Sequence, residues 1–268
     1  MDPSVRLHIN IDHVATVRNA RGTPYPDPTL AARACLEAGA HGITAHLRED
    51  RRHIQDADVE RLRASLRATF NLEMAATDEM VEIAVRLHPD VVTLVPERRE
   101  ERTTEGGLDV VRGGAALAAR VRTLRAAEIK VSLFIAADPA QIDAARALGV
   151  EQIELHTGEY AEAFGHPQSM SAFDLARPPP PTEAARELAR LAKAAAHAHA
   201  LGIEVAAGHG LTTKNVVDLV AIAEIVELNI GHAVVADALF VGIGGATRAM
   251  LAAIEKGRAR AGAVGPSS

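Results

Sequence analysis

The chain has 268 residues, 48% of them hydrophobic, which is enough to bury the core of one large α/β domain or of two small ones. Its net charge of −6 and its lack of Trp argue against nucleic acid as the main partner. The sequence has no export signal and no apolar segment long enough to cross a bilayer, and the lone Cys35 cannot form an internal disulfide. We therefore expect a soluble cytoplasmic protein without a membrane partner.

Short apolar strands alternate with longer Ala-, Leu- and Arg-rich helices along the chain. The strands are predicted near 5–11, 42–47, 70–74, 91–95, 131–135, 152–156, 203–207 and 226–230. The helices are predicted near 29–38, 57–68, 78–87, 108–127, 140–148, 182–201, 215–222 and 233–256, several ending in a glycine suited to a left-handed cap. Eight strand–helix units predict an α/β fold, a (β/α)₈ TIM barrel over residues 1–268. A doubly wound open sheet is the alternative, although it usually has a glycine-rich loop where this chain has "NIDHVATVRNARG".

One segment, 159–181 ("EYAEAFGHPQSMSAFDLARPPPP"), interrupts this alternation between the sixth strand and the sixth helix. Its four prolines cannot lie in a helix interior, and the residues before them have no clear period. In a barrel this insertion would lie on the catalytic face, as a lid or a decoration. A variable surface insertion is the alternative.

Several predicted strands carry polar side chains on one face, although strands of a parallel barrel are covered on both faces. These side chains are His8, Asn10 and Asp12; Thr44, His46 and Arg48; Asn71 and Glu73; Gln152, Glu154 and His156; and Glu227 and Asn229. Buried without partners, each would cost on the order of several kcal/mol. Barrel enzymes carry catalytic groups at the carboxyl ends of their strands, so we predict an active site there. The alternative is a satisfied structural network, above all for His8 and Gln152.

Two Gly/His turns follow the last two strands: "AGHGLT" with His209, and "NIGHAV" with Gly231 and His232 before a helix. Glycine lets backbone N–H groups approach a ligand, and the helix start adds a positive dipole end. These two loops are the common phosphate site of this architecture, so we predict one here. Glycines that serve only the chain reversal are the alternative.

A second basic cluster predicts a second phosphate site and hence two phosphorylated substrates. It consists of residues at the end of the second strand and one from the first loop: Arg48, Arg51, Arg52, His53 and Arg21. The guanidinium group suits phosphate well. Surface pairing of these arginines with Glu49 and Asp50 is the alternative.

Twelve histidines also allow a metal hypothesis, a zinc hydrolase with Asp12 and Glu73 as carboxylate ligands. No HExxH or comparable spacing supports it, so we expect no metal and no cofactor. A non-catalytic phosphate binder or assembly scaffold would explain the glycines and arginines. It would leave no role for His46 and Glu73.

Taken together, "NIDHVATVRNARGT", "GITAHLREDRRHI", "NLEMA", "LVPERREERTTEGGLD", "IELHTG", "AGHGLT" and "ELNIGHA" resemble the pyridoxine 5'-phosphate synthase family, from about Asn10 to the last helix. The resemblance implies a (β/α)₈ barrel with extra helices and a homo-octamer. It also implies condensation of 3-amino-2-oxopropyl phosphate with 1-deoxy-D-xylulose 5-phosphate to pyridoxine 5'-phosphate, phosphate and water. The segment 159–181 departs from the family in length.

The resemblance further implies a role for each matching residue. His46 and Glu73 would accept protons, His209 would donate one, and Glu154 would stabilise a transition state. The aminoketone phosphate would be held by Asn10, Arg21, Gly210, Gly231 and His232. The deoxyxylulose phosphate would be held by Asp12, His13, Arg48, His53 and Thr103. The stretch 103–107, "TTEGG", is interpreted as a mobile lid that excludes water, with an ordinary glycine loop as the alternative.

Overall fold

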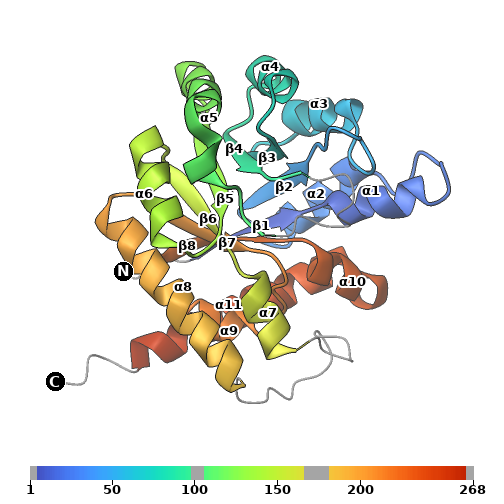
Figure 1. Ribbon diagram of the computed structural model, residues 1–268. Helices are drawn as coiled ribbons and strands as arrows, with labels where there is room; N and C mark the ends of the chain where they lie inside the picture. Colours follow the sequence, from blue (N-terminus) through green and yellow to red (C-terminus); the bar gives the residue numbers. More distant parts are fainter. Residues whose placement is uncertain (1–4, 98–105, 166–180, 264–268) are drawn as a thin grey trace.

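Eight parallel strands close into a barrel in sequence order, with β8 returning to pair with β1, and helices surround them (Figure 1). The structure is a computed structural model that describes residues 5–97, 106–165 and 181–263. The predicted (β/α)₈ barrel is confirmed, and the alternative prediction of a doubly wound open sheet is wrong. Within the described residues, no helix has both the length and the apolar character that crossing a membrane would require.

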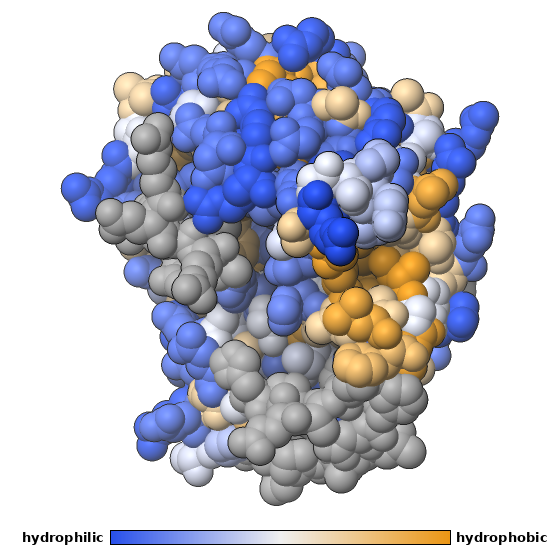
Figure 2. Space-filling model, turned by 90° about the vertical axis from the view of Figure 1, so that its right-hand side faces the viewer, coloured by the Kyte–Doolittle hydropathy of each residue, from blue (hydrophilic) through white to orange (hydrophobic). Residues whose placement is uncertain are grey.

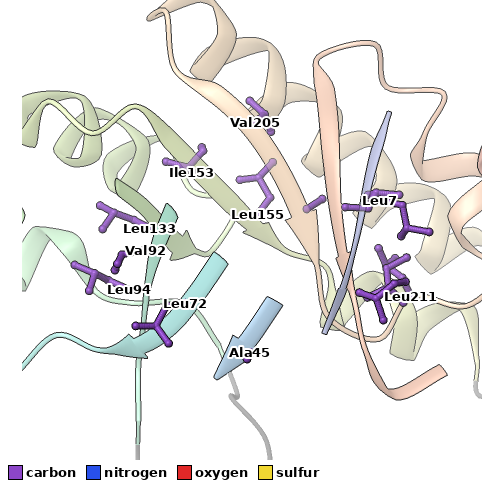
Figure 3. Packing of buried hydrophobic residues seen from close by; sticks show 14 of the residues in the cluster. Leu7, Ala45, Leu72, Val92, Leu94, Leu133, Ile153, Leu155, Val205 and Leu211 are labelled. Atoms are coloured by element: carbon purple, nitrogen blue, oxygen red, sulfur yellow. The ribbon is translucent and has the colours of Figure 1, made fainter. Parts of the chain in front are cut away.

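The strands lie where the sequence predicts them, with ends that differ by at most one residue. They are β1 (Arg6–Asn10), β2 (Gly42–His46), β3 (Thr69–Ala75), β4 (Val91–Val95), β5 (Lys130–Ile135), β6 (Gln152–His156), β7 (Glu204–Gly208) and β8 (Ile225–Ile230). Their alternating apolar residues point toward the helices and form the main core. Figure 3 shows part of this core, with side chains from successive strands.

The helices include two that the sequence analysis does not predict. They are α1 (Asp12–Asn19), α2 (Pro28–Glu37), α3 (Asp56–Ser65), α4 (Asp78–Leu87), α5 (Val110–Ala126), α6 (Pro139–Leu148), α7 (Gly158–Phe164), α8 (Thr182–Ala200), α9 (Val216–Leu219), α10 (His232–Val241) and α11 (Ile243–Ala263). The unpredicted helices are α1 and α7, which directly follow β1 and β6. The single helix predicted over 233–256 is wrong, because Gly242, at φ 72°, separates α10 from α11.

The helix α7 corrects the interpretation of 159–181 as irregular from its start. Tyr160 is almost fully buried, and its hydroxyl donates to the backbone oxygen of Asn215 at 2.7 Å. This contact anchors α7 to the loop after β7, beside the predicted phosphate site. Residues 166–180 of the insertion lie outside the described part of the chain.

The inward side chains at the amino ends of the strands form a structural ion-pair network. The carboxylate of Glu204 accepts from Arg6, from Lys130 at 2.8 Å and from Gln152 at 2.8 Å. Glu227 accepts from Arg6 Nε at 3.0 Å and from Gln152 at 3.2 Å. The expected structural network is therefore confirmed for Gln152. It fills the end of the barrel opposite the predicted site.

Candidate active site

Four polar side chains converge where β1, β2 and β3 end. The amide of Asn10 donates to Asp12 Oδ2 at 3.0 Å and to Glu73 Oε2 at 3.3 Å. The other oxygen of Asp12 accepts the backbone N–H of His46 at 2.8 Å. His46 and Glu73 are opposite each other in the β2–β3 register, and His46 Nδ1 lies 3.9 Å from Glu73 Oε2. The structure thus brings together His46 and Glu73, the two residues predicted from the sequence to accept protons.

Burial and two neighbouring carboxylates set the protonation of Glu73. Burial, then the charges of Glu154 and Asp12, raise the pKa of Glu73 well above its ordinary value. Burial and neighbouring negative charges thus favour the protonated form of this carboxyl group, and a group in such a site can exchange a proton with a bound molecule. The arrangement favours acid–base chemistry at this position.

A third carboxylate, Glu97, contacts His46 and was not singled out in the sequence. Glu97 Oε1 lies 2.8 Å from His46 Nε2, and Glu97 Oε2 accepts the backbone N–H of Glu49 at 3.1 Å. Burial alone would raise the pKa of Glu97, but the hydrogen bond to His46 and that from Glu49 hold it below its ordinary value. The position of Glu97 just after the fourth strand is a sequence signal for an active-site residue. The charged run that follows Glu97 indicates a solvated surface instead.

Glu154 ends a belt of hydrogen bonds that crosses the barrel interior. The amide of Asn229 donates to Glu154 Oε2 at 2.8 Å, and Asn229 accepts from Thr44 at 2.8 Å. The belt continues through Asn71 to Thr93, whose hydroxyl donates to Asn71 at 2.9 Å. Burial, and then the charge of Glu227, raise the pKa of Glu154 to about 8. The belt fixes Glu154 in place, while its depth in the barrel keeps it largely protonated at neutral pH.

Two histidine rings lie side by side at the ends of β6 and β7. The rings of His156 and His209 are 4.9 Å apart, and the edge of Phe134 packs on His156 at 5.3 Å. His209 has a φ of 84°, and its carbonyl accepts the hydroxyl of Thr157 at 2.6 Å. Burial, followed by the proximity of His209, lowers the pKa of His156 to about 4. His156 therefore offers a neutral, rigid surface against which the predicted proton donor His209 rests.

The predicted phosphate loops meet at the start of α10. Gly231 is the N-cap of this helix, so the first N–H groups face outward without a capping side chain at residue 231. The ring of His232 lies 4.9 Å from that of His13, which α1 supplies. Gly210 has a φ of 74°, and a Cβ there would lie 2.6 Å from Ala161 of α7. Gly210 therefore serves close packing whether or not it also binds phosphate.

The second basic cluster divides into a buried and a surface part. Arg48 is buried and pairs with Asp50 at 3.2 Å, and the ring of His53 lies 5.9 Å from that of His46. Arg52 Nη2 lies 2.6 Å from Asp50 Oδ2. Arg51 turns away to Asp56 and Glu79 on α3 and α4. Arg48 and His53 thus remain the candidates for a phosphate site near His46. The predicted pairing with Asp50 is found for Arg52 at the surface and for the buried Arg48, whereas Arg51 pairs with other acids than the sequence suggested.

One predicted binding residue, Arg21, is not brought to this cluster, and another, Thr103, cannot be placed. Arg21 is exposed in the turn after α1, which projects from the side of the barrel (Figure 1), and the described residues give its side chain no hydrogen bond or ion pair. Thr103 lies outside the described residues, as does most of the predicted lid at 103–107.

The metal alternative has one geometric counterpart in the described part of the chain. Ligand atoms of Asp12, His46 and Glu73 lie within 4.8 Å of one another. Both oxygens of Asp12 already accept hydrogen bonds, from Asn10 and from the backbone of His46. This engagement makes Asp12 a poor ligand in the observed geometry. The absence of a metal stays a prediction.

Comparison with known proteins identifies the family. The family model described as pyridoxal phosphate biosynthesis protein PdxJ matches residues 7–256. The chain belongs to this family. A pyridoxine 5'-phosphate synthase from Xanthobacter autotrophicus is 55% identical over 258 residues, covering 96% of each chain. One from Thioalkalivibrio sulfidiphilus is 54% identical over 255 residues, covering 95% of this chain and 98% of the relative.

Solved structures agree on the fold alone. A thiamine phosphate pyrophosphorylase from Pyrococcus furiosus superposes with a TM-score of 0.57 at 14% identity, covering 96% of this chain and 98% of the other. A tryptophan synthase from M. tuberculosis gives 0.59 at 9% identity, covering 94% of each chain. Because the relatives in the PdxJ family are named as enzymes, the non-catalytic binder or scaffold alternative is not supported.

Proposed function

We propose that the chain condenses 3-amino-2-oxopropyl phosphate with 1-deoxy-D-xylulose 5-phosphate to give pyridoxine 5'-phosphate, inorganic phosphate and water. The observation that carries this proposal is the pair His46 and Glu73 at the carboxyl ends of β2 and β3, in a chain of the PdxJ family. Ring formation requires an amine to condense with a ketone, loss of phosphate, an aldol-type closure and loss of water. Each step moves a proton, so several acid–base groups are needed.

The acid–base groups have different roles in these proton transfers, because their surroundings differ. We assign proton acceptance to His46 and Glu73, proton donation to His209, and stabilisation of a transition state to Glu154. The raised pKa of Glu73 supports its part, since a group that titrates nearer neutral pH both takes and returns a proton readily. The raised pKa of Glu154 supports donation of a hydrogen bond to a developing negative charge.

The two phosphate groups would position the substrates on either side of these groups. The N-terminus of α10, with Gly231 and His232, suits the phosphate of the aminoketone. We assign Asn10, Gly210 and Arg21 to the same substrate, although Arg21 lies in the exposed turn after α1. Arg48 and His53 suit the phosphate that is lost, and we assign Asp12, His13 and Thr103 to the rest of that substrate. Holding both substrates by their phosphates would lower the entropic part of the barrier.

The deciding experiment incubates the purified full-length protein with both substrates and follows the pyridine chromophore and released phosphate. Formation of both products by the wild type is expected, and the absence of both would refute the proposal. We expect His46→Asn to abolish turnover, because Asn cannot accept the proton, while calorimetry still detects binding of each substrate. Full activity of His46→Asn would remove His46 from the mechanism.

We also propose that the protein acts in the cytoplasm as a homo-oligomer, specifically a homo-octamer. Supporting the oligomer, an apolar area covers part of the side of the molecule that carries α1 and α10 (Figure 2). On this side of the molecule, α10 carries two large exposed apolar side chains, Leu239 and Phe240, at 74% and 65% exposure. Exposed apolar groups gathered in this way are typical of protein interfaces. The proposed cytoplasmic location is supported by the single cysteine, Cys35, which is buried and cannot form an internal disulfide.

A further inference from the structure

His46 lies between two carboxyl groups that differ in distance and in charge. Glu97 Oε1 is 2.8 Å from Nε2, within hydrogen-bond range, whereas Glu73 Oε2 is 3.9 Å from Nδ1, beyond it. The side chain of Glu97 is only 5% exposed. The hydrogen-bonded partner of His46 is therefore the carboxylate to which no role has been assigned.

We propose that Glu97 is a positioning residue that fixes the ring orientation and the tautomer of His46, so that Nδ1 is the atom that accepts the proton. The inference rests on the proposed function, because it assigns a partner to the base of that reaction. An ionised carboxylate can only accept hydrogen bonds, so the hydrogen between the two groups belongs to Nε2. The lone pair of the neutral ring then lies on Nδ1, the nitrogen that faces Glu73.

The surroundings of Glu97 keep this arrangement rigid. The backbone N–H of Glu49 holds Oε2, and His46 holds Oε1, so both oxygens of the carboxylate are engaged. The backbone N–H of His46 is held in turn by Asp12. A ring fixed at its backbone and at Nε2 has little freedom to turn Nδ1 away from the substrate. The lowered pKa of Glu97 agrees with an ionised group at neutral pH.

The negative charge of Glu97 also assists the proton transfer itself. When Nδ1 accepts a proton the ring becomes an imidazolium, and an adjacent buried carboxylate stabilises that charge without needing to take the proton. Glu73 is less suited to supply this charge, because it lies 3.9 Å from the ring and its burial favours the protonated form. Glu97 and Glu73 thus have different tasks on the two sides of one ring.

The test compares Glu97→Gln, Glu97→Asp and a matched control in the full-length protein. Gln keeps the shape but removes the charge, so we expect kcat to fall about 100-fold, a typical value for acid–base catalysis, with KM for both substrates changed less than about threefold. Asp keeps the charge on a shorter side chain, so Glu97→Asp should retain more activity than Glu97→Gln. The acidic limb of the kcat profile of Glu97→Gln should move to lower pH, since the imidazolium loses its counter-charge.

The matched control is Asp143→Asn. Asp143 makes the same kind of contact, 2.7 Å to His197 Nε2, but on the outer surface between α6 and α8. The kcat of Asp143→Asn should equal that of the wild type. Unchanged kcat and pH profile in Glu97→Gln would overturn the inference. Thermal unfolding of each variant checks that it folds, and if Glu97→Gln does not fold, the tautomer of His46 in the wild type decides the inference.

A second readout does not depend on turnover. Solid-state ¹⁵N NMR of histidine-labelled protein reports which ring nitrogen is protonated, and the His46 signals are those missing from His46→Asn. We expect Nε2 to carry the hydrogen in the wild type. A ring protonated at Nδ1 alone would overturn the inference. If the wild type makes no pyridoxine 5'-phosphate, the proposed function fails, while the NMR result still decides whether Glu97 sets the tautomer of His46.

Discussion

Three glutamates within one barrel mouth have different protonation because their neighbours differ. Glu73 and Glu154 lie deep among other carboxyl groups, and their pKa values are raised. Glu97 accepts hydrogen bonds from a histidine and a backbone N–H, and its pKa is lowered. One residue type thereby supplies two carboxyl groups whose protonated form is favoured and one whose ionised form is favoured. Such differences between neighbouring titratable groups are what separate acid, base and positioning roles.

The raised pKa of Glu154 makes a prediction for stability. An unfolded glutamate ionises near pH 4.5, whereas folded Glu154 keeps its proton to about pH 8, so the folded state binds more protons between these values. The free energy of unfolding should therefore fall with rising pH across this window, by at most about 1.4 kcal/mol per pH unit from this group. Glu154→Gln should lose this slope, as measured by urea unfolding at a series of pH values. Parallel curves for the two proteins would contradict the assignment.

At the scale of elements, the carboxyl end of β7 packs closely against Glu154. A Cβ at Gly208 would lie 2.1 Å from Glu154 Oε1 and 2.9 Å from the carbonyl of Asn229. Gly208→Ala should therefore displace Glu154, lower kcat, and reduce the free energy of unfolding by about 1–3 kcal/mol. Gly244→Ala on α11 is the control, because its nearest contact would be an ordinary 3.4 Å. Equal kcat in the two variants would show that the carboxylate of Glu154 need not be held there.

The strands could be predicted from the sequence because each is a short apolar run bounded by turn residues. The helices α1 and α7 could not, because each has fewer than ten residues and follows a strand at once, so its polar residues were interpreted as loop or insertion. The break at Gly242 lies within "ALFVGIGGA", an apolar run that is typical of one continuous helix.

The site was predictable where polar residues interrupt an apolar strand, as with His46, Glu73 and Glu154. It was not predictable where a charged run continues into a loop. Glu97 precedes "RREER", and only its place just after the fourth strand distinguishes the buried carboxylate from its charged neighbours. The division of the basic cluster between Arg48 and Arg51 likewise depends on which acids of α3 and α4 lie nearby. Such pairings between distant segments follow only from the closed barrel.

At the scale of the whole molecule, the apolar area on the side that carries α10, with the exposed Leu239 and Phe240 of that helix, predicts where copies of the chain meet. Replacing both residues with Glu would place two charges in a buried interface, where unpaired charges are costly. The double variant should therefore sediment as a smaller species than the wild type in analytical ultracentrifugation. Val111→Glu is the control, since Val111 is 55% exposed on α5, away from this area (Figure 1). If the double variant keeps the wild-type sedimentation coefficient while the protein is oligomeric, the copies must meet through another face.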